Sequence, residues 1–550
     1  MNRVHRAVSK VNKRLTVKLA ATLLASSMLL SSLLGFFRDR LLNSAYMPNE
    51  AAGLAGYPVG LDAYTAAFMV PDFMFAILVT GALSVTFIPV FNARWVKGNK
   101  QSAWQIGSSM INFMAIVTMI VSVLIMIFAD FIASIIVPGF NESAHALTVS
   151  MMRVIAVNPF IFAIAAVIAS IQQAVGRFTF YALAPMIYNI GIIIGIVWFT
   201  EGINIFGWEV FDGGIMGVAL GVVLGAILQL IVSALGLVGL GFDYDFKLYW
   251  RNKGFRKVLG LLPARSVDQG MDYAVSLVEL NLLSRMGEGV TRAYNQALTL
   301  HMMPINLIGV AISSAVFPQL SDRLGEGRQD LFQKELRSVL RIIIWLALPT
   351  AVITFFTRGY IVHFIRNTGD PLMAGILGAL VIAILFRIVY HMAARVFYAQ
   401  QDTKTPLYIS FVSIGLNVVL AIVFAMTLDM GAYGLAWAQS IVAVVEVSIL
   451  FYVMRSRMPG LFDLSFINAV WRMLIASAVV AIVCYGGVLL LPFRETDDSF
   501  YSAFPRFVVI VVMSFAAYAA ASKLLKLREI NPVLSRIQKL LFSRFDVKTR

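Results

Sequence analysis

Long apolar runs separated by short polar segments dominate the pattern of the chain. Each run has about 20 residues or more, the length that a helix needs to cross the ~30 Å hydrocarbon core of a bilayer. The runs predict fourteen membrane-spanning helices, near residues 17–37, 61–91, 106–137, 146–175, 181–200, 213–240, 256–284, 293–319, 334–357, 371–399, 406–428, 432–454, 468–492 and 505–525. Internal prolines such as Pro71 and Pro89 in the second run predict tilted or kinked helices.

The positions of the basic residues predict how the chain is oriented. Most of the 44 Lys and Arg residues fall in every second segment between the spans, and these segments lie on the same side of the membrane. They include residues 94–100, 247–257 and 323–341. Segments rich in Lys and Arg stay in the cytoplasm. We therefore expect a multi-pass protein of a bacterial plasma membrane with both termini cytoplasmic, which requires an even number of spans.

Composition excludes several other classes of protein. Hydrophobic residues make up 59% of the chain and charged residues 13%, whereas soluble domains have about 45–50% and 25%. The net charge of +15 does not indicate nucleic-acid binding, because the basic residues lie mainly between the apolar runs. The first apolar run is too long for a signal peptide, so we expect it to be retained as a span.

Catalytic and metal-binding signatures are missing from the sequence. The single cysteine, Cys484, allows neither an intrachain disulfide nor a cysteine metal cluster. No phosphate-binding loop, zinc-protease motif or nucleophile elbow occurs. We therefore predict a protein that is not an enzyme and that holds no metal or cofactor, with a monovalent cation or proton as the coupling ion left open.

An internal repeat relates the two halves of the chain. The segment ALSVTFIP at 82–89 returns as AISSAVFP at 311–318, and the pair Ala63-Tyr64 returns as Ala293-Tyr294 at nearly the same offset. Six predicted spans separate the copies, so the two copies have the same orientation. Parallel repeats of this kind are a transporter architecture with the substrate site near the midplane between the halves.

The repeat predicts an all-α polytopic fold with five parts. They are a basic cytoplasmic N-terminus (1–16), an N-terminal six-helix lobe (17–241), a C-terminal six-helix lobe (255–456), two extra transmembrane helices (468–525) and a basic cytoplasmic tail (526–550). We expect the two parallel six-helix repeats to surround a central cavity.

Several motifs resemble those of a known family, the MurJ (MviN) lipid II flippases. They are LGFFRD at 34–39, Asp62-Ala63 with Pro71, the segment 82–89, and FYAQQDTKTP at 397–406. The resemblance covers nearly the whole chain, and the segment 397–406 is its most specific part. It implies the multidrug/oligosaccharidyl-lipid/polysaccharide exporter fold, with two lobes around a cavity that opens alternately to each side.

The resemblance also implies a substrate and a role for the last two helices. The substrate would be undecaprenyl-pyrophosphate carrying the disaccharide-pentapeptide unit of peptidoglycan, with cationic residues holding the pyrophosphate and a groove in 468–525 holding the lipid tail. The chain has Ser32, Phe75 and Thr299 where many members have a cavity arginine. Either the positive charge has moved to other helices, or the substrate differs.

The seventh span carries four ionisable residues at helical spacing. Arg265, Asp268, Asp272 and Glu279 share one face roughly 60° wide at about 100° per residue. Because charge inside a bilayer is costly, such a face lines a polar cavity or an ion-paired seam between helices. In the first case Arg265 holds an anion, and the three carboxylates serve gating or ion coupling.

The tenth span has a basic face formed by Arg387, His391 and Arg395, with no acid of its own. A guanidinium pairs with phosphate oxygens in bidentate fashion, so Arg387 and His391 are candidate contacts for a pyrophosphate. The alternative is that Arg395 reaches the membrane edge and His391 is simply hydrogen-bonded.

Further candidates lie at the ends of other spans. Arg38 and Arg292 are candidate substrate contacts, whereas Asp39 and Asp62 are candidate gating or coupling residues.

The most economical hypothesis is a lipid II flippase that works by alternating access. A flippase for another polyprenyl-linked glycan and a multidrug or cation antiporter are alternatives on the same fold, and the basic faces argue against small cationic drugs. A non-transporting membrane scaffold is the alternative from another class. Expected partners are lipid II or a related glycolipid, membrane lipids and cell-wall synthesis enzymes, with no nucleic acid.

Overall fold

The computed structural model describes residues 12, 17–46, 59–80, 83–205, 208–211, 213–366, 369–492 and 500–531. Within these ranges it leaves out the side chains of residues 17, 18, 20, 21, 25, 59, 80, 84, 85, 203–205, 208–211 and 263–272. The chain divides into two compact units, residues 1–292 and residues 293–550.

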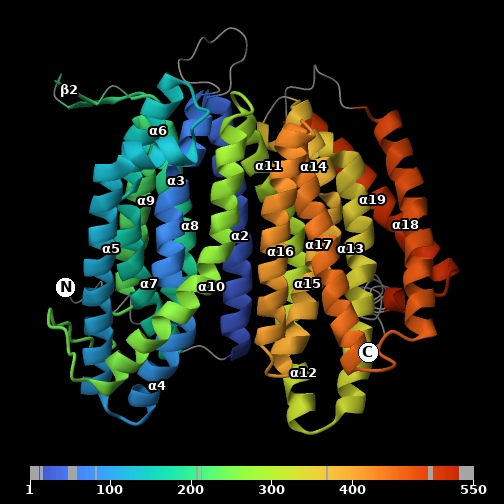
Figure 1. The fold of residues 1–550 in the computed structure, drawn as a ribbon, viewed down its shortest axis with the longest axis horizontal. Helices are drawn as coiled ribbons and strands as arrows, with labels where there is room; N and C mark the ends of the chain where they lie inside the picture. Colours follow the sequence, from blue (N-terminus) through green and yellow to red (C-terminus); the bar gives the residue numbers. More distant parts are fainter. Residues whose placement is uncertain are drawn as a thin grey trace, which may run out of the picture. The chain divides into compact units, whose positions relative to one another are not determined.

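The first unit is a bundle of helices whose axes run side by side (Figure 1). Its helices are α2 (Val17–Tyr46), α3 (Val59–Phe75), α4 (Ile88–Val96), α5 (Lys100–Ile136), α6 (Glu142–Ile155), α7 (Asn158–Ala174), α8 (Thr179–Ile194), α9 (Ile215–Leu235) and α10 (Lys253–Ser284). Single π-helical turns, η1 (Ala76–Thr80), η2 (Leu83–Phe87) and η3 (Gly195–Phe199), interrupt or extend them.

The second unit is built in the same way. Its elements are α11 (Val290–Pro304), which starts just before the boundary, η4 (Ile305–Val310), α12 (Ala311–Gly325), α13 (Gln329–Arg366), α14 (Pro371–Ala379), α15 (Val381–Ala399), α16 (Lys404–Ile422), η5 (Val423–Thr427), α17 (Gly431–Arg457), α18 (Leu464–Leu490), α19 (Phe500–Leu524) and the 3-10 turn η6 (Arg528–Ile530). Helices α18 and α19 pack on each other and on α13.

The predicted fold class, an all-α polytopic membrane protein, is confirmed. In the described part of the chain, twelve helices are long and apolar enough to cross a membrane, against fourteen predicted spans. The other two predicted spans lie on α2 and α10, helices of 30 and 32 residues. Within α10, the described residues include one shorter apolar stretch, Tyr273–Ser284.

Two details differ from the prediction. A small antiparallel hairpin of β1 (Ile203–Ile205) and β2 (Trp208–Phe211) occupies the connection between the predicted spans 181–200 and 213–240, and it pairs Ile203 with Phe211. Helix α13 continues to Arg366, although the predicted span ends at 357, because polar residues at its end hid the continuing helix. The division at residue 292 places α10 with the first unit, and the lobe boundaries proposed from the repeat stay a prediction.

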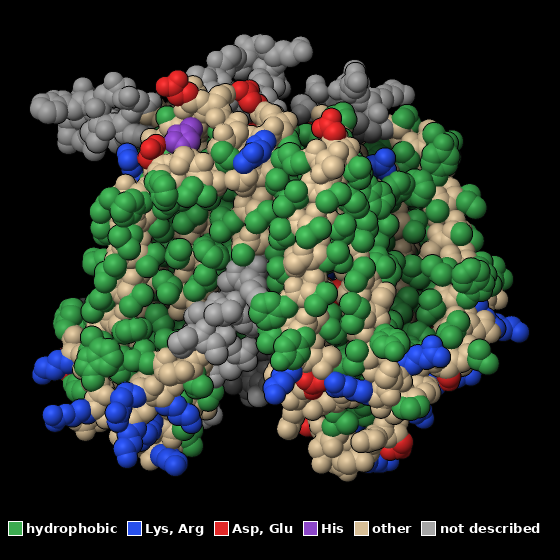
Figure 2. All heavy atoms as spheres, viewed as in Figure 1, with side chains coloured by type: hydrophobic (Ala, Val, Ile, Leu, Met, Phe, Trp, Pro, Cys, Tyr) green, Lys and Arg blue, Asp and Glu red, His purple; other side chains and the backbone are tan. Residues whose placement is uncertain are grey.

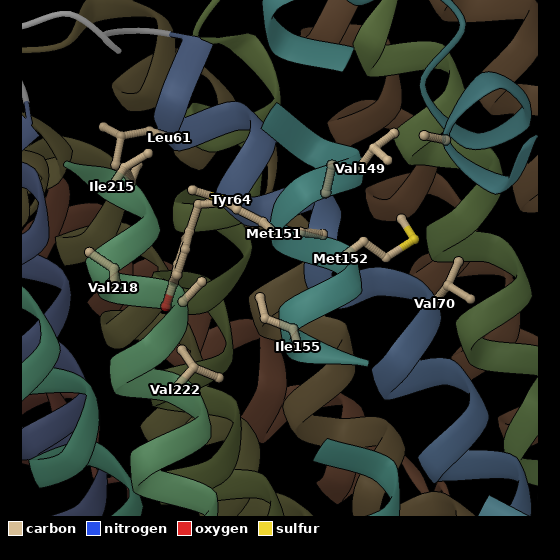
Figure 3. Packing of buried hydrophobic residues seen from close by; sticks show 14 of the residues in the cluster. Leu61, Tyr64, Val70, Val149, Met151, Met152, Ile155, Ile215, Val218 and Val222 are labelled. Carbon is tan, nitrogen blue, oxygen red and sulfur yellow. The ribbon is translucent and has the colours of Figure 1, made fainter. Parts of the chain in front are cut away.

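Helices of the first unit are held together by apolar side chains of α3, α6 and α9. Figure 3 shows Leu61, Tyr64 and Val70 of α3 among the side chains of the other two helices, including Met151 and Val218. These residues are buried. In a bilayer such packing stabilises by close van der Waals contact, because lipid tails are as apolar as the side chains themselves.

Glycines allow α8 and its continuation η3 to approach α9 closely. A Cβ atom added to Gly221 would lie 2.5 Å from the Cα atom of Gly195. Small residues at such crossings are typical of membrane helices, where they let backbones touch. The backbones of η3 and α9 are therefore in close contact at this crossing.

Candidate functional site

Asp39 lies between two arginines in the first unit. Its Oδ1 atom is 3.0 Å from Nη2 of Arg38 and 3.5 Å from Nη2 of Arg292. The exposed fractions of the side chains are 8% for Asp39, 5% for Arg292 and 22% for Arg38. One carboxylate therefore faces two guanidinium groups, so this triad carries a net charge of about +1.

Arg38 is also held by α8. Its Nη1 atom donates to Oδ1 of Asn189 at 3.0 Å. The amide of Asn189 is oriented in turn by donating to the carbonyl of Pro185 at 3.1 Å. Arg38 is thus fixed by two neighbours, and of the two arginines it is the one with more access to solvent.

Arg292 is placed more deeply. Its Nη2 atom lies 3.4 Å from Oδ1 of Asn43, and its guanidinium stands 5.9 Å from the centre of the Tyr64 ring. A buried cation over an aromatic face gains from the ring's negative face. The contacts of Arg292 are those of a residue that positions Asp39, and its predicted contact with substrate stays a prediction.

Asp62 binds the start of α11. Its two carboxylate oxygens accept from the backbone N–H groups of Gly289 at 2.5 Å and Arg292 at 2.7 Å. The first N–H groups of a helix lack partners within it, and a negative charge there is favourable. Asp62 therefore links α3 to α11, and the repeat pairing of Ala63 with Ala293 makes Asp62 and Arg292 equivalent positions.

The stripe predicted on the seventh span is only partly described. The backbone of α10 is helical throughout, but the side chains of Arg265, Asp268 and Asp272 lie outside the described residues. Glu279 is buried in the first unit. The roles predicted for these four residues remain predictions.

In the second unit Arg387 of α15 has an acidic partner from α17. Its Nη1 atom is 2.9 Å from Oε2 of Glu446, and the exposed fractions of the two side chains are 32% and 3%. Ser410 of α16 lies 3.4 Å from Oε1 of Glu446. The basic face of the tenth span is therefore partly neutralised, which the pattern of that span alone does not reveal.

His391 lies on the same helix as Arg387. Its ring meets the edge of the neighbouring Tyr390 at 5.8 Å between centroids, and Tyr390 also lies 5.6 Å from the Arg387 guanidinium. His391 is half-buried. Its predicted contact with a pyrophosphate stays a prediction.

A buried polar cluster near the end of α13 is absent from the sequence-based candidates. Nε of Arg366 donates to Oε1 of Gln296 at 2.9 Å, and Arg366 also pairs with Asp370. Asp370 accepts from the backbone of Met373 and so begins α14. The predicted span ends at residue 357, so the sequence pattern places Arg366 outside the spans.

The motif at 397–406 forms a junction between helices. Asp402 accepts from the backbone N–H of Thr405 at 3.0 Å and from Nη1 of Arg457 at 2.6 Å. Its hydrogen bond from the Thr405 hydroxyl, with that from Arg457, holds the pKa of Asp402 well below its ordinary value. The most specific sequence motif therefore has a clear structural role, joining the start of α16 to the end of α17.

A cavity of about 610 Å³ adjoins this junction. It is lined by the ends of α12, α13, α15 and α17, including Gln329, Gln333, Gln400 and Arg457. None of the residues that line it is a predicted site residue. No group of three or more metal-ligating side chains occurs in the part of the chain that the structure describes.

Long apolar helices that hold a buried charged triad and a buried ion pair indicate a polytopic α-helical membrane transporter, because charge inside a membrane marks transport pathways. A family model described as "Lipid II flippase MurJ" matches residues 52–510. The chain belongs to the lipid II flippase MurJ family.

Curated relatives support the assignment over more than nine-tenths of the chain. A probable lipid II flippase MurJ of Thermotoga maritima is 24% identical over 513 residues, which cover 92% of this chain and 96% of the relative. One from Bdellovibrio bacteriovorus is 23% identical over 540 residues, covering 96% and 98%. The family resemblance stated from the motifs is therefore confirmed.

Solved structures show the same fold. A lipid II flippase MurJ in an inward closed conformation aligns with a TM-score of 0.73 at 22% identity, over 92% of this chain and 98% of that one. An inward-facing multidrug resistance MATE family transporter aligns with a TM-score of 0.65 at 15% identity, over 81% and 99%. The flippase and the multidrug transporters thus share an architecture with this chain.

Proposed function

We propose that this protein translocates lipid II from the cytoplasmic to the outer leaflet of a bacterial plasma membrane by alternating access. The observation that carries the proposal is the family match over residues 52–510, supported by relatives aligned over more than nine-tenths of the chain. Both termini lie in the cytoplasm in this proposal, as the distribution of Lys and Arg predicts.

In the first unit, Arg38 is the proposed contact for the pyrophosphate. It belongs to a triad with more positive than negative charge, and it is the more exposed of the two arginines around Asp39. A planar guanidinium can donate two parallel hydrogen bonds to phosphate oxygens. Arg292 and Asp39 then act as positioning residues that keep Arg38 extended.

In the second unit, Arg387 is the proposed contact, with His391 beside it. The side chain of Arg387 is about one-third exposed and forms an ion pair with the buried Glu446. An arriving phosphate would compete with Glu446 for the guanidinium, so we propose that this contact forms and breaks during the cycle. Arg265 of α10 is the third proposed cation.

Ion coupling is assigned to the carboxylates of α10. Asp268, Asp272 and Glu279 are the proposed sites where a monovalent cation, a proton or the membrane potential acts on the cycle. The two helices that follow the repeat, within 468–525, are proposed to hold the lipid tail. Cell-wall synthesis enzymes are the proposed protein partners.

Complementation tests the function. The chain is expressed in a bacterium depleted of its own lipid II flippase, and lipid II in the outer leaflet is measured. We expect rescue by the wild-type chain, strong loss with Arg38→Ala and partial activity with Arg38→Lys, which keeps the charge but not the planar fork. Failure of the wild-type chain despite normal membrane insertion would point to another polyprenyl-linked glycan.

A further inference from the structure

One end of the first unit carries a group of basic side chains for which the described residues provide no ion pair within 4.0 Å. Lys and Arg residues gather there in Figure 2, where Figure 1 places α4 and the start of α10. The exposed members are Lys97, Lys100, Lys247, Arg251, Lys253, Arg256 and Lys257. We call residues 94–100 together with residues 242–257 the basic ledge.

The charges of the basic ledge differ from other arginines of the chain in their pairing. Arg323, Arg337 and Arg341 of the second unit each form an ion pair with Glu or Asp at 3.2 Å or less. Within the described residues, no ion pair within 4.0 Å joins a Lys or Arg of the basic ledge to an acid. Asp243 and Asp245 are its acidic residues, so its net charge is strongly positive.

Aromatic rings lead from the core of the first unit out to this surface. Successive ring centroids lie 5.1 to 6.2 Å apart along Phe91, Trp95, Trp104, Phe242 and Tyr244 and 4.9 Å apart from Tyr244 to Phe246. The exposed fraction rises to 84% at Phe246, and it is 52% at the nearby Trp250. Two large aromatic rings are therefore exposed to solvent beside cations that form no ion pair with the described residues.

Helix α5 holds this segment in place. Nδ2 of Asn112 donates to the carbonyl of Asp245 at 2.8 Å, and the N–H of Tyr249 donates to Oγ of Ser109 at 2.9 Å. The hydroxyl of Tyr249 donates to the carboxylate of Asp245 and lowers the pKa of that group. Hydrogen bonds to α5 therefore position the backbone that carries the exposed rings and cations, and the carboxylate of Asp245 accepts from the Tyr249 hydroxyl and from the backbone N–H of Lys247.

We propose that the basic ledge binds the headgroups of anionic phospholipids at the membrane surface. Lys and Arg attract acidic lipid phosphates, and Trp, Tyr and Phe settle at the level of the headgroups. Exposed apolar rings favour a bilayer over a soluble acidic partner, because a membrane interface removes them from water. The ledge would thereby hold the start of α10 at the interface, a role separate from substrate transport.

Native mass spectrometry of the detergent-purified protein tests the proposal, with phosphatidylglycerol and phosphatidylcholine added stepwise. The test variant is Lys247→Gln/Arg251→Gln/Lys253→Gln. Its charge-matched control is Arg328→Gln/Lys334→Gln/Arg455→Gln, which removes three exposed cations of the second unit that form no ion pair among the described residues. A second variant, Phe246→Ala/Trp250→Ala, removes the exposed rings and leaves the charge unchanged.

We expect the test variant to bind phosphatidylglycerol about tenfold or more weakly, since each cation near an acidic surface contributes severalfold. Phosphatidylcholine binding and the melting temperature should not change, and the control should keep wild-type affinity. The ring variant should also lose affinity. Equal losses in test and control would show a general effect of net charge and overturn the proposal. The proposal would also be overturned if the test variant lost binding to an acidic peptide while its affinity for phosphatidylglycerol stayed unchanged.

Discussion

Replacing Asp39 by asparagine tests whether this carboxylate is the shared counter-ion of Arg38 and Arg292. Asparagine keeps the shape of the side chain and removes its charge. The exposed fraction of the Arg292 side chain is 5%, so its charge would remain buried with its ion pair lost. Removing one partner of a buried pair costs about 3–5 kcal/mol, and we expect the lower end, about 3 kcal/mol, because Arg38 gives water partial access.

The arginines should behave unequally. Arg38→Gln should cost only about 1 kcal/mol, since Asp39 keeps Arg292 as a partner and Arg38 is partly exposed. In the double variant Arg38→Gln/Asp39→Asn, the two costs should not add, because residues in one ionic network are coupled by about 0.5–3 kcal/mol.

Reversible unfolding in mixed micelles of sodium dodecyl sulfate and a mild detergent measures these costs through tryptophan fluorescence. The control is Asp322→Asn, which removes an exposed carboxylate that forms no ion pair in the described part of the chain. If Asp39→Asn stayed within about 0.5 kcal/mol of the wild type, the range of ordinary surface substitutions, the reasoning would be refuted.

Three further predictions concern other contacts. Glu446→Gln should lower stability by about 1–2 kcal/mol in the same unfolding assay, because it replaces an ion-paired hydrogen bond by one between the Arg387 cation and a neutral amide, while Arg387 can turn toward water; no loss would mean that the pair is not formed. Gly221→Ala should lower the melting temperature clearly, since its Cβ would lie 2.5 Å from a backbone atom of α8's extension, whereas Gly415→Ala, which meets nothing within 4 Å, should not; equal melting temperatures would contradict the close crossing. Asp402, whose pKa is lowered in the folded state, should contribute stability above its unfolded pKa of about 3.9 and lose that contribution as pH falls below it; melting curves of the wild type and Asp402→Asn should therefore converge at acidic pH, and a constant difference would contradict the assignment.

The helical fold follows from the sequence because apolar runs of bilayer length have few alternatives. Each of the fourteen predicted spans coincides with a helical segment of the structure, from α2 to α19. Element ends were less predictable: Arg366 looks like a loop residue, although it is buried at the end of α13. The hairpin of β1 and β2 is not predicted because its strands have only three and four residues, too few for an alternating pattern to be recognised.

The site was predictable in its cations and not in their partners. Arg38, Arg292 and Arg387 stood out because charge in a span is rare. Partners come from other elements: the neutral amide of Asn189 in α8 for Arg38, the carboxylate of Asp39 in α2 for Arg292, and that of Glu446 in α17 for Arg387. Such pairs depend on which helices become neighbours, and spacing along one helix contains no information on that.

The two ion-paired arginine sites differ in the charge that they leave uncompensated, and this difference suggests different tasks. At Asp39, two guanidinium groups share one carboxylate, so an anion can approach Arg38 while Arg292 keeps Asp39 satisfied. At Glu446, one guanidinium pairs with one buried carboxylate. An anion can therefore bind Arg387 only if the ion pair with Glu446 breaks and that carboxylate keeps its remaining neighbours alone. The first arrangement favours standing affinity for a phosphate. The arrangement at Glu446 makes anion binding costly unless a proton or a cation neutralises the carboxylate at the same moment. Such a requirement couples anion binding to the binding of a proton or cation.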